Sequence, residues 1–168
     1  MRRAFLQRAA LVGVSAGLAS CGFKLRTSRD FAFTRIAITP HPGDALAQEL
    51  RRSFGDAVHV LAADEPLTQA QLVLSLGNEL REKVVVGVNS AGQVREFQLR
   101  LRVQLHLRNA QGKGLMEGVE ILQQRDISFN ESAVLAKEAE EILLYRDMQT
   151  DIVQQILRRL STVQASQL

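Results

Sequence analysis

The strongest pattern in this 168-residue chain is a strict alternation of apolar and polar side chains between Glu96 and Arg108. The odd positions of that segment are all apolar: Phe97, Leu99, Leu101, Val103, Leu105 and Leu107. A repeat of two places successive side chains on opposite faces of a β-strand, so the segment predicts one long strand with a dry and a wet face. Burial of six such side chains contributes on the order of 1.5–3 kcal/mol each before entropy is counted. We therefore expect this strand to organise the core.

Three other segments predict strands, at 31–39, 71–80 and 119–129. Leu72, Leu74, Leu76 and Leu80 are expected to share one face of the second of these. After the charged residues 81–83, the strand is expected to continue or to start again at 84–88. A short apolar piece at 58–61 precedes the loop around Pro66.

Two segments have helical spacing. Asp44 is a plausible N-cap for a short helix in which Leu46, Leu50 and Phe54 recur every fourth residue. A longer helix ends near Leu160, and its apolar stripe is expected to comprise Leu135, Ala139, Ile142, Tyr145, Met148, Ile152, Ile156 and Leu160. The order β-α-β-β-β-α predicts an α+β fold in which two helices pack on one face of a mostly antiparallel four-stranded sheet.

The N-terminus has the three parts of an export signal. Arg2, Arg3 and Arg8 form a positive region, an apolar stretch follows, and small residues precede Cys21. The ending Leu18-Ala19-Ser20-Cys21 resembles a bacterial lipobox, in which the signal is cut before an acylated cysteine. We therefore predict a cleaved signal at 1–20, a lipidated tether at 21–30, a single domain at 31–163 and a frayed tail at 164–168.

Two details bear on export and destination. Gly22 follows the cysteine, where an aspartate would direct the lipoprotein to the inner membrane. By resemblance to enterobacterial sorting, the absence of that aspartate favours the outer membrane. The arginine pair at the N-terminus is compatible with a twin-arginine signal, and also with an ordinary secretory signal, so both export routes stay open.

Charge and side-chain chemistry exclude several classes of function. Without the three signal arginines the chain has 18 basic and 18 acidic residues, which gives a neutral mature protein and argues against a nucleic-acid binder. His41, His59 and His106 lack metal-ligand spacing. A run of carboxylates at Glu138, Glu140 and Glu141 is better explained as an exposed helix face than as an acid–base pair. We expect no enzyme, metal or cofactor.

The wet face of the long strand is the remaining candidate for binding. Arg100 and Arg102 lie on it together with His106 and Arg108, while Arg95 has the opposite parity. Guanidinium groups suit phosphate and carboxylate oxygens. The alternative is a solvated strand face, in which glutamines simply alternate with the arginines.

Three segments together resemble the LptE family. They are Cys21-Gly22-Phe23-Lys24-Leu25-Arg26, then Gly92-Gln93-Val94-Arg95-Glu96-Phe97 at a hairpin, and finally Leu135-Ala136-Lys137-Glu138 with Gln154-Gln155-Ile156-Leu157-Arg158-Arg159-Leu160 in the last helix. They follow the lipobox in the family's order and extend over nearly all of the mature chain. The family's fold, helices on a four-stranded sheet, agrees with the predicted order of elements.

The resemblance implies a protein of the outer membrane that plugs the β-barrel LptD and helps to deliver lipopolysaccharide to the outer leaflet. It also implies lipopolysaccharide binding through basic residues, for which Lys137, Arg95, Arg100 and Arg102 are the candidates. Lys137 matches a basic position of the family, whereas the hairpin turn lacks the family's frequent basic residue and has Asn89-Ser90-Ala91 instead. A lipoprotein adaptor of another envelope lipid transporter is the main alternative, and a lipid-anchored enzyme is the second.

Overall fold

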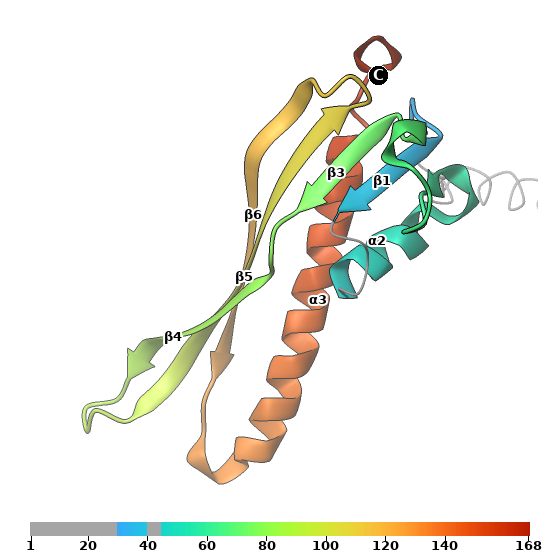
Figure 1. Ribbon diagram of the computed structural model, residues 1–168. Helices are drawn as coiled ribbons and strands as arrows, with labels where there is room; N and C mark the ends of the chain where they lie inside the picture. The colour runs from blue at the N-terminus through green and yellow to red at the C-terminus, as the bar shows by residue number, and fades with distance from the viewer. Residues whose placement is uncertain (1–29, 40–44) are drawn as a thin grey trace, which may run out of the picture.

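The computed structural model describes residues 30–39 and 45–168 (Figure 1). Its main elements are β1 (Arg35–Thr39), α2 (Ala45–Phe54), β2 (His59–Val60), β3 (Leu72–Leu76), β4 (Leu80–Val88), β5 (Val94–Asn109), β6 (Gly114–Ser128) and α3 (Val134–Leu160). Short 3-10 turns lie at Gly55–Ala57, Leu67–Gln69, Glu131–Ala133 and Ala165–Gln167. The α+β class is confirmed. The molecule is elongated, and β4, the start of β5, the end of β6 and the start of α3 form one end of it (Figure 1).

The sheet differs from the prediction because it has six strands and mixed directions. Its order is β2-β1-β3-β5-β4. β3 and β4 pair with successive parts of one edge of β5, and β6 pairs with the opposite edge. The pairs of β1 with β2 and with β3 are parallel, and all pairs of β5 are antiparallel. The helix between β1 and β2 provides the crossover that a parallel pair needs. The two-residue strand β2 is too short to be recognised from apolar periodicity.

A bulge divides what the sequence predicts as one strand into β3 and β4. Both pair with the same edge of β5, with Leu76 opposite Leu105 and Leu80 opposite Arg102. The chain therefore advances four residues from Leu76 to Leu80 while β5 advances only three, from Leu105 to Arg102. The extra residue reverses the alternation of faces. As a result Leu80 lies on the wet face, at 50% exposure, and not with Leu76 as the sequence predicts. The charged residues 81–83 lie inside β4 and do not interrupt it.

The alternation in β5 is confirmed. Leu99, Leu101, Val103, Leu105 and Leu107 are at most 1% exposed and face the helices, and Phe97 is partly buried. The polar residues between them face away from the helices. At the β1 end of the sheet this second face is covered by the segment 61–71, which buries Leu61 and Ala70 against Ala37 and Val73. Over β4, β5 and β6 the second face is open.

The two hairpins of the meander β4-β5-β6 use the same turn. Asn89 Oδ1 accepts hydrogen bonds from the amides of Ala91 and Gln93 (3.0 and 2.9 Å), and Asn109 Oδ1 accepts from Gln111 and Lys113 (3.1 and 2.9 Å). The fourth residue of each turn is a glycine with positive φ, +78° at Gly92 and +83° at Gly112. An Asn-x-x-Gly sequence therefore fixes the register of both hairpins.

The long helix α3 packs along the sheet, but only its second half is fully covered. Met148, Ile152 and Ile156 are buried as expected, whereas Leu135 is 82% and Ile142 70% exposed. The predicted apolar stripe is therefore wrong for the first half, because α2 is too short to cover it (Figure 1).

Two side-chain hydrogen bonds connect the C-terminal part of the chain to the sheet. The Tyr145 hydroxyl donates to the Glu82 carbonyl of β4 (2.8 Å), and burial, followed by the nearby Glu141 carboxylate, raises the pKa of that hydroxyl. After the helix, the segment for which the sequence predicts a frayed tail forms the turn Ala165–Gln167. Asn109 Nδ2 donates to the Gln167 carbonyl (3.0 Å).

Candidate functional site

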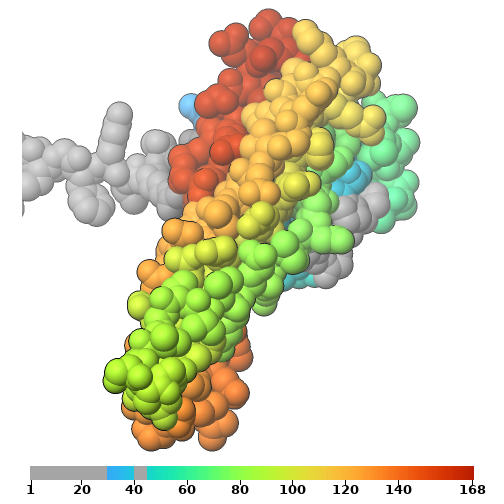
Figure 2. Space-filling view, turned by 90° about the vertical axis from the view of Figure 1, so that its left-hand side faces the viewer, coloured from blue at the N-terminus to red at the C-terminus, as the bar shows by residue number. Residues whose placement is uncertain are grey.

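The open face of β4, β5 and β6 contains two of the four predicted basic residues. This face runs along the molecule in Figure 2, where the three strands form a continuous band. Arg102 stands between Leu80 of β4 and Leu122 of β6, which are 50% and 42% exposed. Arg100, two residues earlier on β5, stands between Glu82 and Gln124. The face therefore offers guanidinium groups next to exposed aliphatic side chains, a combination suited to an anionic amphiphile.

The two guanidinium groups differ in how far they are already engaged. Arg102 Nη2 lies 3.4 Å from Glu82 and its Nη1 lies 3.7 Å from Glu120, while its Nε is buried without a hydrogen-bond partner. Arg100 Nε donates to Gln98 Oε1 (2.8 Å), and Arg100 has no ion pair within the described residues. Arg100 is thus the more available anion ligand, because a phosphate at Arg102 competes with two carboxylates.

Arg95 and Lys137 lie on the other side of the sheet, so the four predicted residues do not form one cluster. Arg95 is exposed near the hairpin tip and contacts Gln93 Oε1 (3.3 Å). Lys137 Nζ contacts Ser128 Oγ (3.0 Å) and the Glu140 carboxylate (2.8 Å). Arg95 has an odd number, like the residues of β5 that face the helices, so its side chain lies on the opposite face of the sheet from Arg100.

Lys83 was not recognised from the sequence. It lines a hollow of about 60 Å³ together with Lys137, Phe97 and Phe129. Its Nζ lies 4.6 Å from the centre of the Phe97 ring and 2.6 Å from Glu141 of α3. The bulge before β4 turns Lys83 toward the helix, and nothing in the local sequence indicates that reversal of faces. Since Glu138 and Glu141 also line this hollow, it is a less favourable place for an anion than the open face.

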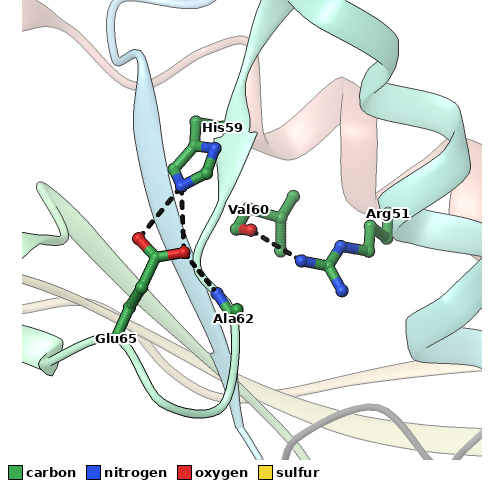
Figure 3. Close-up of polar contacts among 5 residues, drawn as sticks. All are labelled: Arg51, His59, Val60, Ala62 and Glu65. Atoms are coloured by element: carbon green, nitrogen blue, oxygen red, sulfur yellow. Dashed lines mark hydrogen bonds and ion pairs between the residues drawn. The ribbon is translucent and has the colours of Figure 1, made fainter.

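The two histidines of the described residues, His59 and His106, bind protein groups. His41 lies outside the described residues, and His106 Nδ1 accepts a hydrogen bond from the Gly118 amide (3.0 Å). His59 Nε2 contacts the Glu65 carboxylate at 3.0 Å, beside the bond from Arg51 to the Val60 carbonyl (Figure 3). No group of three or more possible metal ligands occurs within residues 30–39 and 45–168.

Glu65 closes the loop after β2. Its carboxylate accepts a hydrogen bond from the Ala62 amide (3.0 Å), and this bond, followed by that of His59, lowers the pKa of Glu65 (Figure 3). Its contribution to stability is therefore present above the ordinary pKa of a glutamate and is lost as the pH falls through the lowered pKa. The contacts of Arg51, His59 and Glu65 therefore stabilise the loop after β2.

The predicted lipidation site, Cys21, lies outside the described residues, as do the signal and most of the tether. Among the helices of the described parts, none is both long enough and apolar enough to cross a membrane.

The decisive comparison is with a protein-family model. The model of LptE, described as lipopolysaccharide-assembly, matches residues 33–160. This chain belongs to the LptE family. The match extends from just before β1 to the last residue of α3, so the predicted family resemblance is confirmed over the whole sheet and both helices.

Solved structures agree with the LptE assignment. The solution structure of uncharacterized lipoprotein B from Nitrosomonas europaea has 36% identity and a TM-score of 0.68, and the match covers 83% of this chain and 90% of that one. Rare lipoprotein B from Shewanella oneidensis (20%, TM-score 0.64, 77% and 95% covered) and a minor lipoprotein from Acinetobacter baumannii (21%, 0.59, 77% and 91%) share the fold. No curated protein matches the chain.

Proposed function

We propose that this protein is an outer-membrane lipoprotein, held on the periplasmic face by lipid on Cys21, that plugs an LptD-type β-barrel and helps to insert lipopolysaccharide into the outer leaflet. The observation that carries the proposal is the match to the lipopolysaccharide-assembly family over residues 33–160. The resemblance of Leu18-Ala19-Ser20-Cys21 to a lipobox supports the anchor.

The shape and surface of the molecule are consistent with a plug. The molecule is elongated (Figure 1), and the open face of its sheet is mainly polar. A barrel lumen is polar and accepts such a surface.

The open face also supports lipopolysaccharide binding by basic residues. Lipopolysaccharide combines phosphate groups with acyl chains, and Arg100 and Arg102 stand beside exposed Leu80 and Leu122. In the proposed contact, Arg100 is the main phosphate ligand, because no carboxylate engages it within the described residues. Lys137 and Arg95 would form a second, weaker contact on the helix side, where Glu140 already engages Lys137.

Recovery of the partner from membranes tests the plug. We expect a C-terminally tagged chain, solubilised from outer membranes in mild detergent, to bring down a barrel protein in a one-to-one complex. The barrel should be identified by mass spectrometry and by its heat-dependent migration in gels. Recovery of inner-membrane transporter subunits in place of a barrel would contradict the plug and support the adaptor alternative.

Paired substitutions test the lipopolysaccharide contact. Arg100→Gln with Arg102→Gln should weaken binding of purified lipopolysaccharide about tenfold or more, since a hydrogen bond to a charged group contributes roughly 1.5–3 kcal/mol. Binding should also become less sensitive to salt. Arg95→Gln with Lys137→Gln removes the same formal charge from the other side of the sheet and should have a smaller effect. Unchanged affinity in both double variants would rule out these basic residues as ligands.

A further inference from the structure

The ion pairs of Arg102 on the open face are long for charged groups. Its Nη2 lies 3.4 Å from the carboxylate of Glu82, and its Nη1 lies 3.7 Å from that of Glu120. The pair of Arg125 with Asp151, which joins β6 to α3, measures 2.6 Å. Charge-assisted hydrogen bonds usually measure about 2.7–2.9 Å, and the Nε of Arg102 is buried without a hydrogen-bond partner among the described residues. Arg102 is therefore held loosely, by two carboxylates that a ligand can displace.

Glu82 stands between the two guanidinium groups of the open face. The register of β4 and β5 places it directly opposite Arg100, while its carboxylate contacts Arg102. The Tyr145 hydroxyl donates to its main-chain carbonyl (2.8 Å), which fixes this position of β4 from the helix side of the sheet. Glu120 contacts Arg102 from β6. The two glutamates cancel the formal charge of the two arginines, so an anion reaches Arg102 only by displacing carboxylates.

The kind of phosphate group decides whether this displacement is favourable. A phosphodiester carries one negative charge on two free oxygens, as a carboxylate does, so its exchange for a glutamate at Arg102 gains little. A phosphomonoester carries about 1.5 to 2 negative charges near neutral pH, on three free oxygens. It attracts a guanidinium more strongly, and its oxygens can bridge Arg100 and Arg102, which lie two residues and thus about 7 Å apart along β5. The two glutamates therefore select against a singly charged headgroup.

The exposed aliphatic side chains next to Arg102 favour a lipid over a free phosphate ion. Leu80 of β4 and Leu122 of β6 are its partners in the register on either side, and they are 50% and 42% exposed. An acyl chain that covers them removes apolar surface from water, which a phosphate ion cannot do. The headgroup and the acyl chain of one lipid can thus contact the same row of the sheet.

We propose that Glu82 and Glu120 are specificity-determining residues of the open face, which make Arg102 available to a phosphomonoester lipid but not to a phosphodiester lipid. Arg100, which no carboxylate engages within the described residues, makes the first contact with either headgroup. Only the phosphomonoester then gains enough to displace both glutamates from Arg102. This inference rests on the proposed function, because it names the headgroup chemistry that the lipopolysaccharide contact selects.

Glu82→Gln with Glu120→Gln tests the selection in the full-length lipidated chain, purified in detergent. The probes are short-chain phosphatidic acid, a phosphomonoester, and short-chain phosphatidylglycerol, a phosphodiester, with identical acyl chains. In isothermal titration calorimetry the wild type should bind phosphatidic acid about fivefold more tightly than phosphatidylglycerol. The double variant should bind phosphatidylglycerol about threefold more tightly than the wild type does, because Arg102 is then free for either headgroup. Its preference for phosphatidic acid should fall to about twofold or less.

Glu96→Gln with Asp126→Asn is the matched control. It removes the same formal charge from the open face, but neither residue pairs with Arg102. Circular dichroism should show that both double variants are folded, since none of the four side chains is buried. The control should keep the preference of the wild type for phosphatidic acid. Inorganic phosphate should compete with phosphatidic acid at least about tenfold less well than unlabelled phosphatidic acid does, because it lacks acyl chains.

The inference is overturned by equal binding of the two lipids to the wild type, or by an unchanged preference in the variant of Glu82 and Glu120. Loss of the preference in the control, or equally strong competition by inorganic phosphate, also overturns it. In each of these cases recovery of the barrel still supports the plug. The lipopolysaccharide contact likewise stands if Arg100→Gln with Arg102→Gln weakens the binding of lipopolysaccharide.

Discussion

Replacing Leu101 with alanine should lower the free energy of unfolding by about 2–5 kcal/mol, the usual range for a fully buried leucine. Leu101 is 0% exposed at the centre of β5, which pairs with three other strands and faces α3. Truncation removes apolar contacts and leaves a cavity that a sheet paired on both sides cannot easily close. Since domains of this size are stable by about 5–15 kcal/mol, the variant should unfold at a much lower urea concentration.

The matched control is Gln104→Ala, three residues further along the same strand. Gln104 is exposed on the opposite face, and its truncation should change the free energy of unfolding by no more than about 0.5 kcal/mol. Urea titration followed by circular dichroism measures both variants. Equal midpoints for the two would mean that the alternation in β5 does not determine the core.

Replacing Cys21 with serine should release the protein from the membrane. Each methylene of an acyl chain contributes about 0.8 kcal/mol to membrane binding, so a diacylglycerol group makes release extremely slow. Serine lacks the thiol that forms the thioether, and the chain has no other cysteine. We expect loss of palmitate labelling and loss of the protein from the outer-membrane fraction.

Gly22→Asp tests the choice of membrane separately from lipidation. If the sorting resemblance holds, this variant should keep the palmitate label and move to the inner membrane. Palmitate labelling of the Cys21→Ser variant would show that Cys21 is not the lipidation site.

Much of the fold can be predicted from local pattern. The period of two in β5, the spacing of α2 and the second half of α3 determine which side chains are buried, because burial and backbone geometry agree there. The family resemblance, drawn from segments at both ends of the mature chain, identified the fold correctly at the level of class.

The remainder depends on tertiary structure. The exposure of Leu80 follows from one extra residue between β3 and β4, and no local signal indicates that bulge. The same shift turns Lys83 toward α3. The exposure of Leu135 and Ile142 depends on where α2 stops, which helical spacing in α3 alone cannot reveal. The separation of Arg100 from Lys137, by contrast, follows from the alternation in β5, because Arg100 lies on the polar face and α3 packs on the apolar one.

The length of β5 determines how far the protein can reach. Sixteen residues at about 3.3 Å each give a strand about 50 Å long, whereas the hydrocarbon core of a bilayer is about 30 Å thick. The register pairs Ile36, the second residue of β1, with Leu72, and Leu72 with Asn109. The start of β1 therefore lies at the Asn109 end of β5, far from the hairpin tip at residues 89–92. The hairpin tip therefore lies farther from the start of β1 than the hydrocarbon core of one membrane is thick. With the proposed lipid anchor in the inner leaflet, a domain of this length would be long enough to act at the outer leaflet.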